Sequence, residues 1–145
     1  MDEVVTRTLA AGTVRGRRDG DVEVYRGLPY ATAERFSPPV PATWSGTLDA
    51  LDFGPIAPQV AGAQFQRVDL HQDEQCLSLN VWTAADGADP RPVMVWVHGG
   101  AFRTGSGASP LYDGRPLVER GDVVVVTLNY RLGALGFLAH RSLGA

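Results

Sequence analysis

Residues 93–102 read VMVWVHGGAF, and they carry the strongest local indication of the fold. Its first five residues form a continuous apolar run, which is typical of a β-strand covered on both faces. Two glycines follow where that strand is expected to end, and glycine permits backbone conformations closed to other residues. Successive N–H groups in such a loop can converge on an anion, or on an oxygen that becomes negative during a reaction. From these residues alone, an ordinary glycine-rich turn is the alternative interpretation.

The next apolar run predicts a second strand beside the first. It covers Val123–Leu128, and Leu111–Arg120 is expected to form a short helix between the two runs. Two apolar strands separated by one helix are typical of a parallel βαβ unit. We therefore expect Val93–Val97 and Val123–Leu128 to be neighbouring parallel strands. The glycine loop would then lie at the carboxyl end of the first strand, where ligand sites of open α/β sheets are found.

The amino-terminal part predicts antiparallel strands. Short extended segments at Val4–Leu9, Thr13–Arg17 and Val22–Tyr25 flank the turn dipeptide Asp19-Gly20. A further strand is expected at Leu77–Trp82.

Residues 28–60 contain six prolines and predict a long ordered loop, because proline interrupts regular elements. Aromatic side chains in it can each bury a large apolar area and are expected to anchor it. These are Tyr30, Phe36, Trp44 and Phe53.

Composition narrows the classes of function. The chain has 145 residues, a formal net charge of −3 and 44% hydrophobic residues, as expected for one globular domain. The mild acidity argues against a nucleic-acid or anionic-membrane partner. All 13 cationic residues are arginine, so lysine chemistry is absent. Cys76 is the single cysteine and is expected to be a buried packing thiol. With neither a secretory signal nor an apolar run of about 20 residues, we expect a cytoplasmic protein.

The sequence contains no complete motif for dinucleotide binding, for a nucleophilic serine or for a metal site. Gly105-Ser106-Gly107 could begin a dinucleotide-binding loop, but Pro110 stands where the third glycine is required. No G-x-S-x-G occurs, and neither Ser106 nor Ser109 lies at a predicted strand-to-helix elbow. The three histidines lack the close spacing of metal ligands, so we expect no metal and no cofactor. His98 is expected to support the loop rather than to act as a base.

Several motifs in one order resemble the type B carboxylesterase/lipase family, which includes bacterial para-nitrobenzyl esterases and the cholinesterases. The resemblance spans roughly residues 13–140. Besides HGGAF, the motifs are RGLPYA at 26–31, RF at 35–36, WSG at 44–46, FGP at 53–55, EQCLSLNVW at 74–82 and NYRLGALGFL at 129–138.

The resemblance implies an α/β fold: a mostly parallel sheet flanked by helices, with an antiparallel amino-terminal hairpin region. It implies that residues 1–145 are the amino-terminal portion of one α/β-hydrolase domain, truncated before the nucleophile elbow. The implied reaction is hydrolysis of a small-molecule carboxylic ester by serine through an acyl-enzyme. By the family pattern, the backbone N–H groups of Gly100 and Ala101 are oxyanion donors, and Gly99 shapes the loop. The nucleophile, acid and base are expected outside this chain, which should be inactive alone. A non-catalytic binding module on the same scaffold is the alternative.

Further expectations also rest on the resemblance. Arg35 and Glu74 should form a buried structural ion pair, and Arg131 should lack its acidic family partner and be more exposed than its neighbours. The sequence departs from the family pattern at two positions. Gln75 stands where the family motif E-D-C-L, here Glu74 to Leu77, has aspartate. Ala57 stands where secreted relatives have a cysteine. The second departure fits a bacterial-type member in a reducing compartment.

Overall fold

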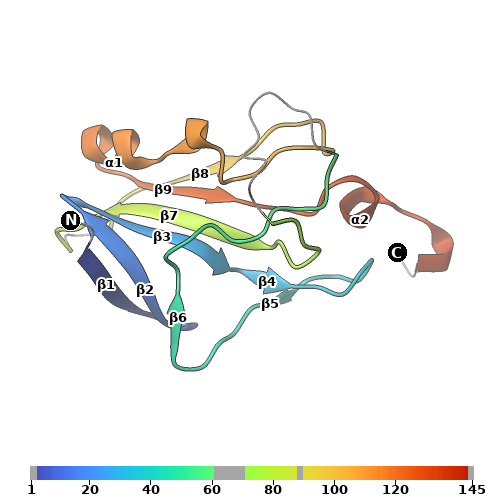
Figure 1. Ribbon diagram of the computed structural model, residues 1–145, viewed down its shortest axis with the longest axis horizontal. Coiled ribbons are helices and arrows are strands. Elements are labelled where there is room, and N and C mark those ends of the chain that lie inside the picture. Colours follow the sequence, from blue (N-terminus) through green and yellow to red (C-terminus); the bar gives the residue numbers. More distant parts are fainter. Residues whose placement is uncertain (1–2, 61–70, 88–89, 144–145) are drawn as a thin grey trace.

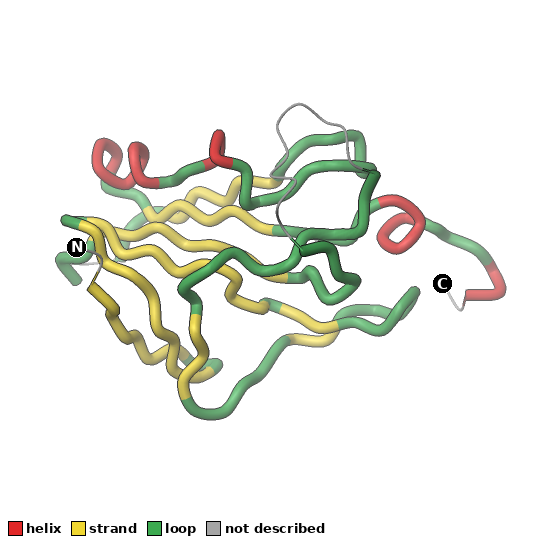
Figure 2. Tube along the Cα trace, in the orientation of Figure 1, coloured by secondary structure: helices red, strands yellow, loops and turns green. Residues whose placement is uncertain are grey.

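A mixed β-sheet forms the body of the molecule, and the helices are few and short (Figure 1, Figure 2). The computed structural model describes residues 3–60, 71–87 and 90–143. The strands are β1 (Glu3–Leu9), β2 (Gly12–Asp19), β3 (Val22–Pro29), β4 (Ala31–Thr32), β5 (Val40–Pro41), β6 (Thr47–Asp49), β7 (Ser78–Ala84), β8 (Val93–Val97) and β9 (Val124–Leu128). The helical elements are η1 (Pro110–Tyr112), α1 (Arg115–Gly121), α2 (Gly133–Phe137) and η2 (Arg141–Leu143).

The sheet has the strand order β1-β2-β3-β7-β9-β8, with β6 beside β2. The predicted parallel pairing of β8 with β9 is confirmed, in a register from Val93 opposite Val124 to Val97 opposite Leu128. Every pair from β1 to β9 along this order is antiparallel. The antiparallel region of this chain is therefore larger than the expected hairpins. β4 and β5 form a separate two-stranded sheet.

The helix before β9 begins later than the sequence predicted. Residues 110–112 form the 3₁₀ turn η1, and α1 starts at Arg115. Pro116 explains the break, because its ring would clash with the carbonyl of Tyr112 in a continuous α-helix. The helix ends at Gly121, and Asp122 follows in the left-handed conformation, with a φ of 50°.

The core lies between α1 and one face of the sheet. Val118 of α1 packs in a buried cluster with Val22 and Val24 of β3, Trp82 of β7 and Val125 of β9. Burying one such aliphatic side chain contributes about 1.5–3 kcal/mol.

A second cluster lies nearer the carboxyl ends of the strands. It surrounds the predicted packing thiol Cys76, which is fully buried. Burial raises the pKa of this thiol, so Cys76 is a weak nucleophile at neutral pH.

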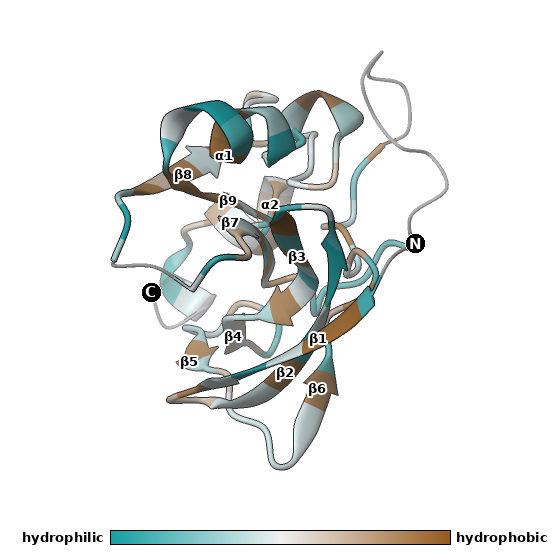
Figure 3. Cartoon of the chain, turned by 90° about the vertical axis from the view of Figure 1, so that its left-hand side faces the viewer, coloured by the Kyte–Doolittle hydropathy of each residue, from teal (hydrophilic) through white to brown (hydrophobic). Residues whose placement is uncertain are grey.

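β8 corrects one expectation, because neither of its faces is buried in the part of the chain that the structure describes, although Trp96 contacts the Tyr112 ring at a centroid distance of 5.3 Å. All five of its residues are exposed, from 43% for Met94 to 60% for Val97. β8 is the edge strand, and α1 packs on β3, β7 and β9 instead. Figure 3 shows hydrophobic residues along β8 and β9. The apolar run thus indicates a strand suited to burial, but the described residues do not bury it.

The loop from residue 28 to 60 is ordered by aromatic contacts and contains three short strands. The indole of Trp44 donates a hydrogen bond to the carbonyl of Thr13 at 3.0 Å. The guanidinium of Arg26 lies 4.9 Å from the ring centre of Phe53. Phe36 is not an anchor: it is 38% exposed, because it occupies a projecting turn at a φ of 59°.

Candidate functional site

The glycine loop lies directly after β8, as the sequence predicted. The carbonyl of Gly100 accepts hydrogen bonds from the N–H groups of Arg103 (3.0 Å) and Thr104 (3.1 Å), which close a tight turn. Gly100 has a φ of 126°, and a Cβ atom there would lie only 1.8 Å from the Thr104 carbonyl oxygen. Ala101 and Phe102 follow in the left-handed region, at φ values of 52° and 59°. Such conformations cost about 1–3 kcal/mol per non-glycine residue and cluster at functional sites.

This turn leaves consecutive backbone N–H groups, from Gly99 to Phe102, without an acceptor among the described residues, and Gly100 and Ala101 are the middle two. Within residues 3–60, 71–87 and 90–143, no group accepts a hydrogen bond from the N–H of Gly100 or of Ala101. Both residues are exposed, so water satisfies these donors in the absence of a ligand. Two N–H groups on one tight turn are suited to bind an anionic oxygen.

His98 connects the strand to the loop and is buried, with 3% exposure. Its ring stacks on Tyr130 at a centroid distance of 4.4 Å, and its Nδ1 lies 2.8 Å from the Gly99 carbonyl oxygen. The hydroxyl of Tyr130 donates to the His98 carbonyl at 2.8 Å. Burial lowers the pKa of His98, so the imidazole is neutral at pH 7. These contacts fit a support for the loop rather than a general base.

The expected structural pair between Arg35 and Glu74 is in contact but is not buried. The guanidinium binds the carboxylate through both Nε and Nη2, with Nε 2.9 Å from Oε2. The two side chains are 63% and 32% exposed, so the expectation of a buried pair is wrong. Solvent screens an exposed pair of this kind, so it contributes little to stability. Arg131 is half-buried, like Tyr130 before it, and donates to the Ser37 carbonyl at 2.9 Å.

One serine–histidine contact was not predicted from the sequence. Nδ1 of His140 lies 2.7 Å from Oγ of Ser142, two residues along the chain. Both residues are exposed and follow α2 in the chain. No carboxylate in the described ranges contacts His140, so nothing orients its ring as a catalytic base requires. The third histidine, His71, is exposed and lies 3.5 Å from Asp73.

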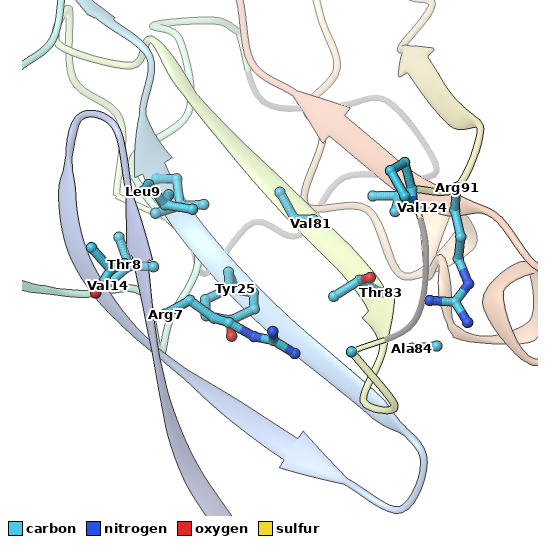
Figure 4. A pocket seen from close by; sticks show the side chains of 13 residues that line it. Arg7, Thr8, Leu9, Val14, Tyr25, Val81, Thr83, Ala84, Arg91 and Val124 are labelled. Atoms are coloured by element: carbon cyan, nitrogen blue, oxygen red, sulfur yellow. The ribbon is translucent and has the colours of Figure 1, made fainter.

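One cavity lies on another part of the sheet, beside β1, β3 and β7. It has a volume of about 430 Å³ and opens on the face opposite α1 (Figure 4). Arg7 and Tyr25 lie at this cavity, and both bind the buried carboxylate of Glu23. No residue of the glycine loop lines it. The sequence analysis did not predict this Arg7–Glu23–Tyr25 cluster. The alternation of polar and apolar residues along a strand does not indicate which residues of neighbouring strands will be in contact.

Other kinds of site find no support in the described ranges. They contain no cluster of three or more His, Cys, Asp or Glu side chains suited to hold a metal ion. They also contain no helix that is long and apolar enough to cross a membrane.

Comparison with known proteins places these features in a family. The family model described as "Carboxylesterase family" matches residues 2–144. The chain is 44% identical over 138 residues to a para-nitrobenzyl esterase from Bacillus subtilis (strain 168), which covers 90% of this chain and 28% of that protein. It is 44% identical over 151 residues to a fumonisin B1 esterase from Sphingopyxis macrogoltabida, covering 98% of this chain and 27% of that protein.

Solved structures agree with the sequence matches. A structure of a thermophilic PNB esterase matches 94% of this chain and 30% of its own, with a TM-score of 0.87 and 41% identity. The expected α/β-hydrolase fold is thereby confirmed. The chain spans less than a third of the length of these relatives.

Proposed function

Because this chain belongs to the carboxylesterase family, we propose that it contributes the oxyanion-binding loop of a serine esterase acting on small carboxylic esters. The observation that carries the proposal is the pair of unengaged N–H groups on Gly100 and Ala101, at the carboxyl end of β8. In ester hydrolysis, attack on the carbonyl carbon places negative charge on its oxygen. Donors already fixed at that position stabilise the transition state without reorganisation, and each contributes about 3–4 kcal/mol.

The loop geometry supports this role over that of an ordinary turn. Gly100 is the residue whose φ and close approach to Thr104 exclude a side chain. Its carbonyl is engaged by two turn hydrogen bonds, whereas the N–H groups of Gly100 and Ala101 have no acceptor among the described residues. His98 beneath the loop is neutral and buried, so it adds no charge that would compete for the oxyanion.

We further propose that residues 1–145 do not hydrolyse esters by themselves. An oxyanion hole stabilises charge that exists only after a nucleophile has attacked. Ser106 and Ser109 are buried at 4% and 6% exposure, and the exposed Ser142–His140 contact lacks an orienting carboxylate in the described ranges. We expect the chain alone to give no turnover of para-nitrophenyl acetate above buffer. A rate that is abolished by Gly100→Pro would overturn this expectation.

The oxyanion role is tested in a chimera in which residues 1–145 replace the matching segment of the Bacillus subtilis para-nitrobenzyl esterase. We expect the chimera to hydrolyse para-nitrophenyl acetate. Gly100→Ala keeps the backbone N–H but adds a Cβ that would lie 1.8 Å from the Thr104 carbonyl oxygen, so the loop must shift and displace its donors. We expect kcat to fall by about 10²–10³-fold, as when an oxyanion donor is lost. Gly46→Ala is the matched control: Gly46 also has a positive φ, 72°, but an added Cβ would contact nothing within 4 Å. A folded chimera without activity would favour a non-catalytic binding module, and equal kcat values for the two variants would refute the oxyanion assignment.

A further inference from the structure

The segment that follows the oxyanion loop, residues 105–107, packs against His98 and Gly99 at the start of that loop. Gly105 has a φ of 114°, and a Cβ atom there would lie 2.4 Å from Nδ1 of His98 and 2.5 Å from the Gly99 carbonyl oxygen. The amide of Gln59 also binds both the N–H (2.7 Å) and the carbonyl (3.0 Å) of Gly105. Because these atoms are in direct contact, a displacement of residues 105–107 would be transmitted to Gly99 and to the donors after it.

Buried side chains from the sheet hold the next glycine of this segment. The N–H of Gly107 donates to Oδ1 of Asn129 at 2.8 Å, and its carbonyl accepts from Oγ1 of Thr127 at 2.7 Å. Nδ2 of Asn80 donates to the same Thr127 oxygen at 2.9 Å. The exposures of Asn80, Thr127 and Asn129 are only 2%, 1% and 3%. A hydrogen bond formed in such surroundings is strongly directional, and a lost partner costs about 1–3 kcal/mol.

Each of the two asparagines is fixed at both ends of its side-chain amide. Oδ1 of Asn80 accepts from the Gly27 N–H at 3.0 Å, and Nδ2 of Asn129 donates to the Pro55 carbonyl at 3.0 Å. Asn80 therefore presents its N–H to Thr127, whose hydroxyl accepts that bond and has its single proton left for the Gly107 carbonyl. The two hydrogen bonds therefore fix the orientation of the Thr127 hydroxyl, with its proton directed at the Gly107 carbonyl.

We propose that Thr127 and Asn129 are positioning residues for the oxyanion loop, and that Asn80 orients the Thr127 hydroxyl. This inference rests on the proposed function of the loop. Neither residue touches the substrate in this proposal; they hold Gly107, which holds the return segment against His98 and Gly99. The polar pair explains why the otherwise apolar β9 carries a buried threonine and is followed by a buried asparagine.

Two substitutions of Thr127 in the chimera separate positioning from packing. Thr127→Val keeps the shape of the side chain and removes the hydroxyl, whereas Thr127→Ser keeps the hydroxyl and removes a methyl group. We expect Thr127→Val to lower kcat for para-nitrophenyl acetate by about 10–100-fold with little change in KM, since a small misplacement of catalytic groups has an effect of this size. Thr127→Ser should retain kcat close to that of the unmodified chimera. Amide hydrogen exchange over residues 98–107 should accelerate in the valine variant alone.

The opposite order would overturn the proposal, because a purely packing role predicts that serine, which leaves a cavity, is the more damaging substitution. Equal kcat values for the valine, serine and unmodified proteins would overturn it too. If Thr127→Val fails to fold, Thr127→Ala and Thr127→Ser differ only by the hydroxyl, and equal kcat values for that pair refute the inference. A failure of the proposed function is distinguishable, since Gly100→Ala would then also leave kcat unchanged.

Discussion

Substitution of Arg7 by methionine tests how much the buried Glu23 carboxylate depends on its partner. Glu23 accepts hydrogen bonds from Nε of Arg7 at 2.9 Å, from Nη2 of Arg7 at 3.1 Å and from the Tyr25 hydroxyl at 2.8 Å. Its side chain is 6% exposed, whereas that of Arg7 is 42% exposed. Methionine retains most of the aliphatic stem of arginine, so the change removes mainly the charge and its two hydrogen bonds.

The expected loss of stability follows from this asymmetry. Removing one partner of a fully buried ion pair costs about 3–5 kcal/mol, because a charge is left uncompensated. Solvent screens the Arg7 side, and Tyr25 still donates, so we expect the free energy of unfolding to fall by about 2 kcal/mol at pH 7. Arg15→Met is the matched control. Arg15 makes the same two-bonded contact with Asp49, but both side chains are about half exposed, and the loss should stay below about 1 kcal/mol.

The pH dependence supplies a second check. Burial alone would raise the pKa of Glu23, but the hydrogen bonds from Arg7 and Tyr25 outweigh it and hold that pKa below the usual 4.5. A lowered carboxyl pKa stabilises the fold above the unfolded-state value, and this contribution is lost as the pH falls through the folded-state value. The difference between wild type and Arg7→Met should therefore be largest near pH 7 and shrink below about pH 4.

The measurement is urea unfolding at low protein concentration, followed by tryptophan fluorescence, to which Trp82 in the core contributes. Glu23→Gln combined with Arg7→Met should recover part of the loss, because the buried charge is then gone. Equal losses for Arg7→Met and Arg15→Met, or a loss that does not change with pH, would refute the reasoning.

Two further predictions concern the edge strand and the buried histidine. Val95→Lys places a charge on the apolar edge strand β8 and should reduce self-association of the chain in sedimentation velocity, since charges protect exposed strand edges. Val60→Lys, on an exposed loop, should not reduce it, and equal masses for the two variants would contradict the prediction. Burial lowers the pKa of His98, so the wild-type chain should lose stability as the pH falls below about 6.5, where His98 of the unfolded chain takes up a proton first. This pH-dependent loss of stability should be absent in His98→Asn and present in His71→Asn. Thermal unfolding between pH 7 and pH 5 measures it.

Whereas the short strands β4, β5 and β6 could not be predicted from the sequence, the longer strands, the parallel pair and the place of the glycine loop could. These features follow from local physics: a run of apolar β-branched residues favours a strand, and a crossover through a helix returns the chain parallel. The family resemblance also brought Arg35 and Glu74 together correctly. It did not report their exposure, because exposure depends on what packs over a residue and not on the residue itself.

How these elements pair and which of them are covered emerges from the tertiary structure. The apolar residues of β8 show a preference for burial, but β7 pairs with β9 on its other side and leaves β8 at the edge. The contacts on Gly107 likewise come from the register of the sheet, which sets Asn80 opposite Thr127 across β7 and β9. In the sequence both are ordinary polar residues on strands. Hydrogen bonds require atoms within about 3 Å and in the right direction, and this condition is met only when segments distant in sequence are packed together.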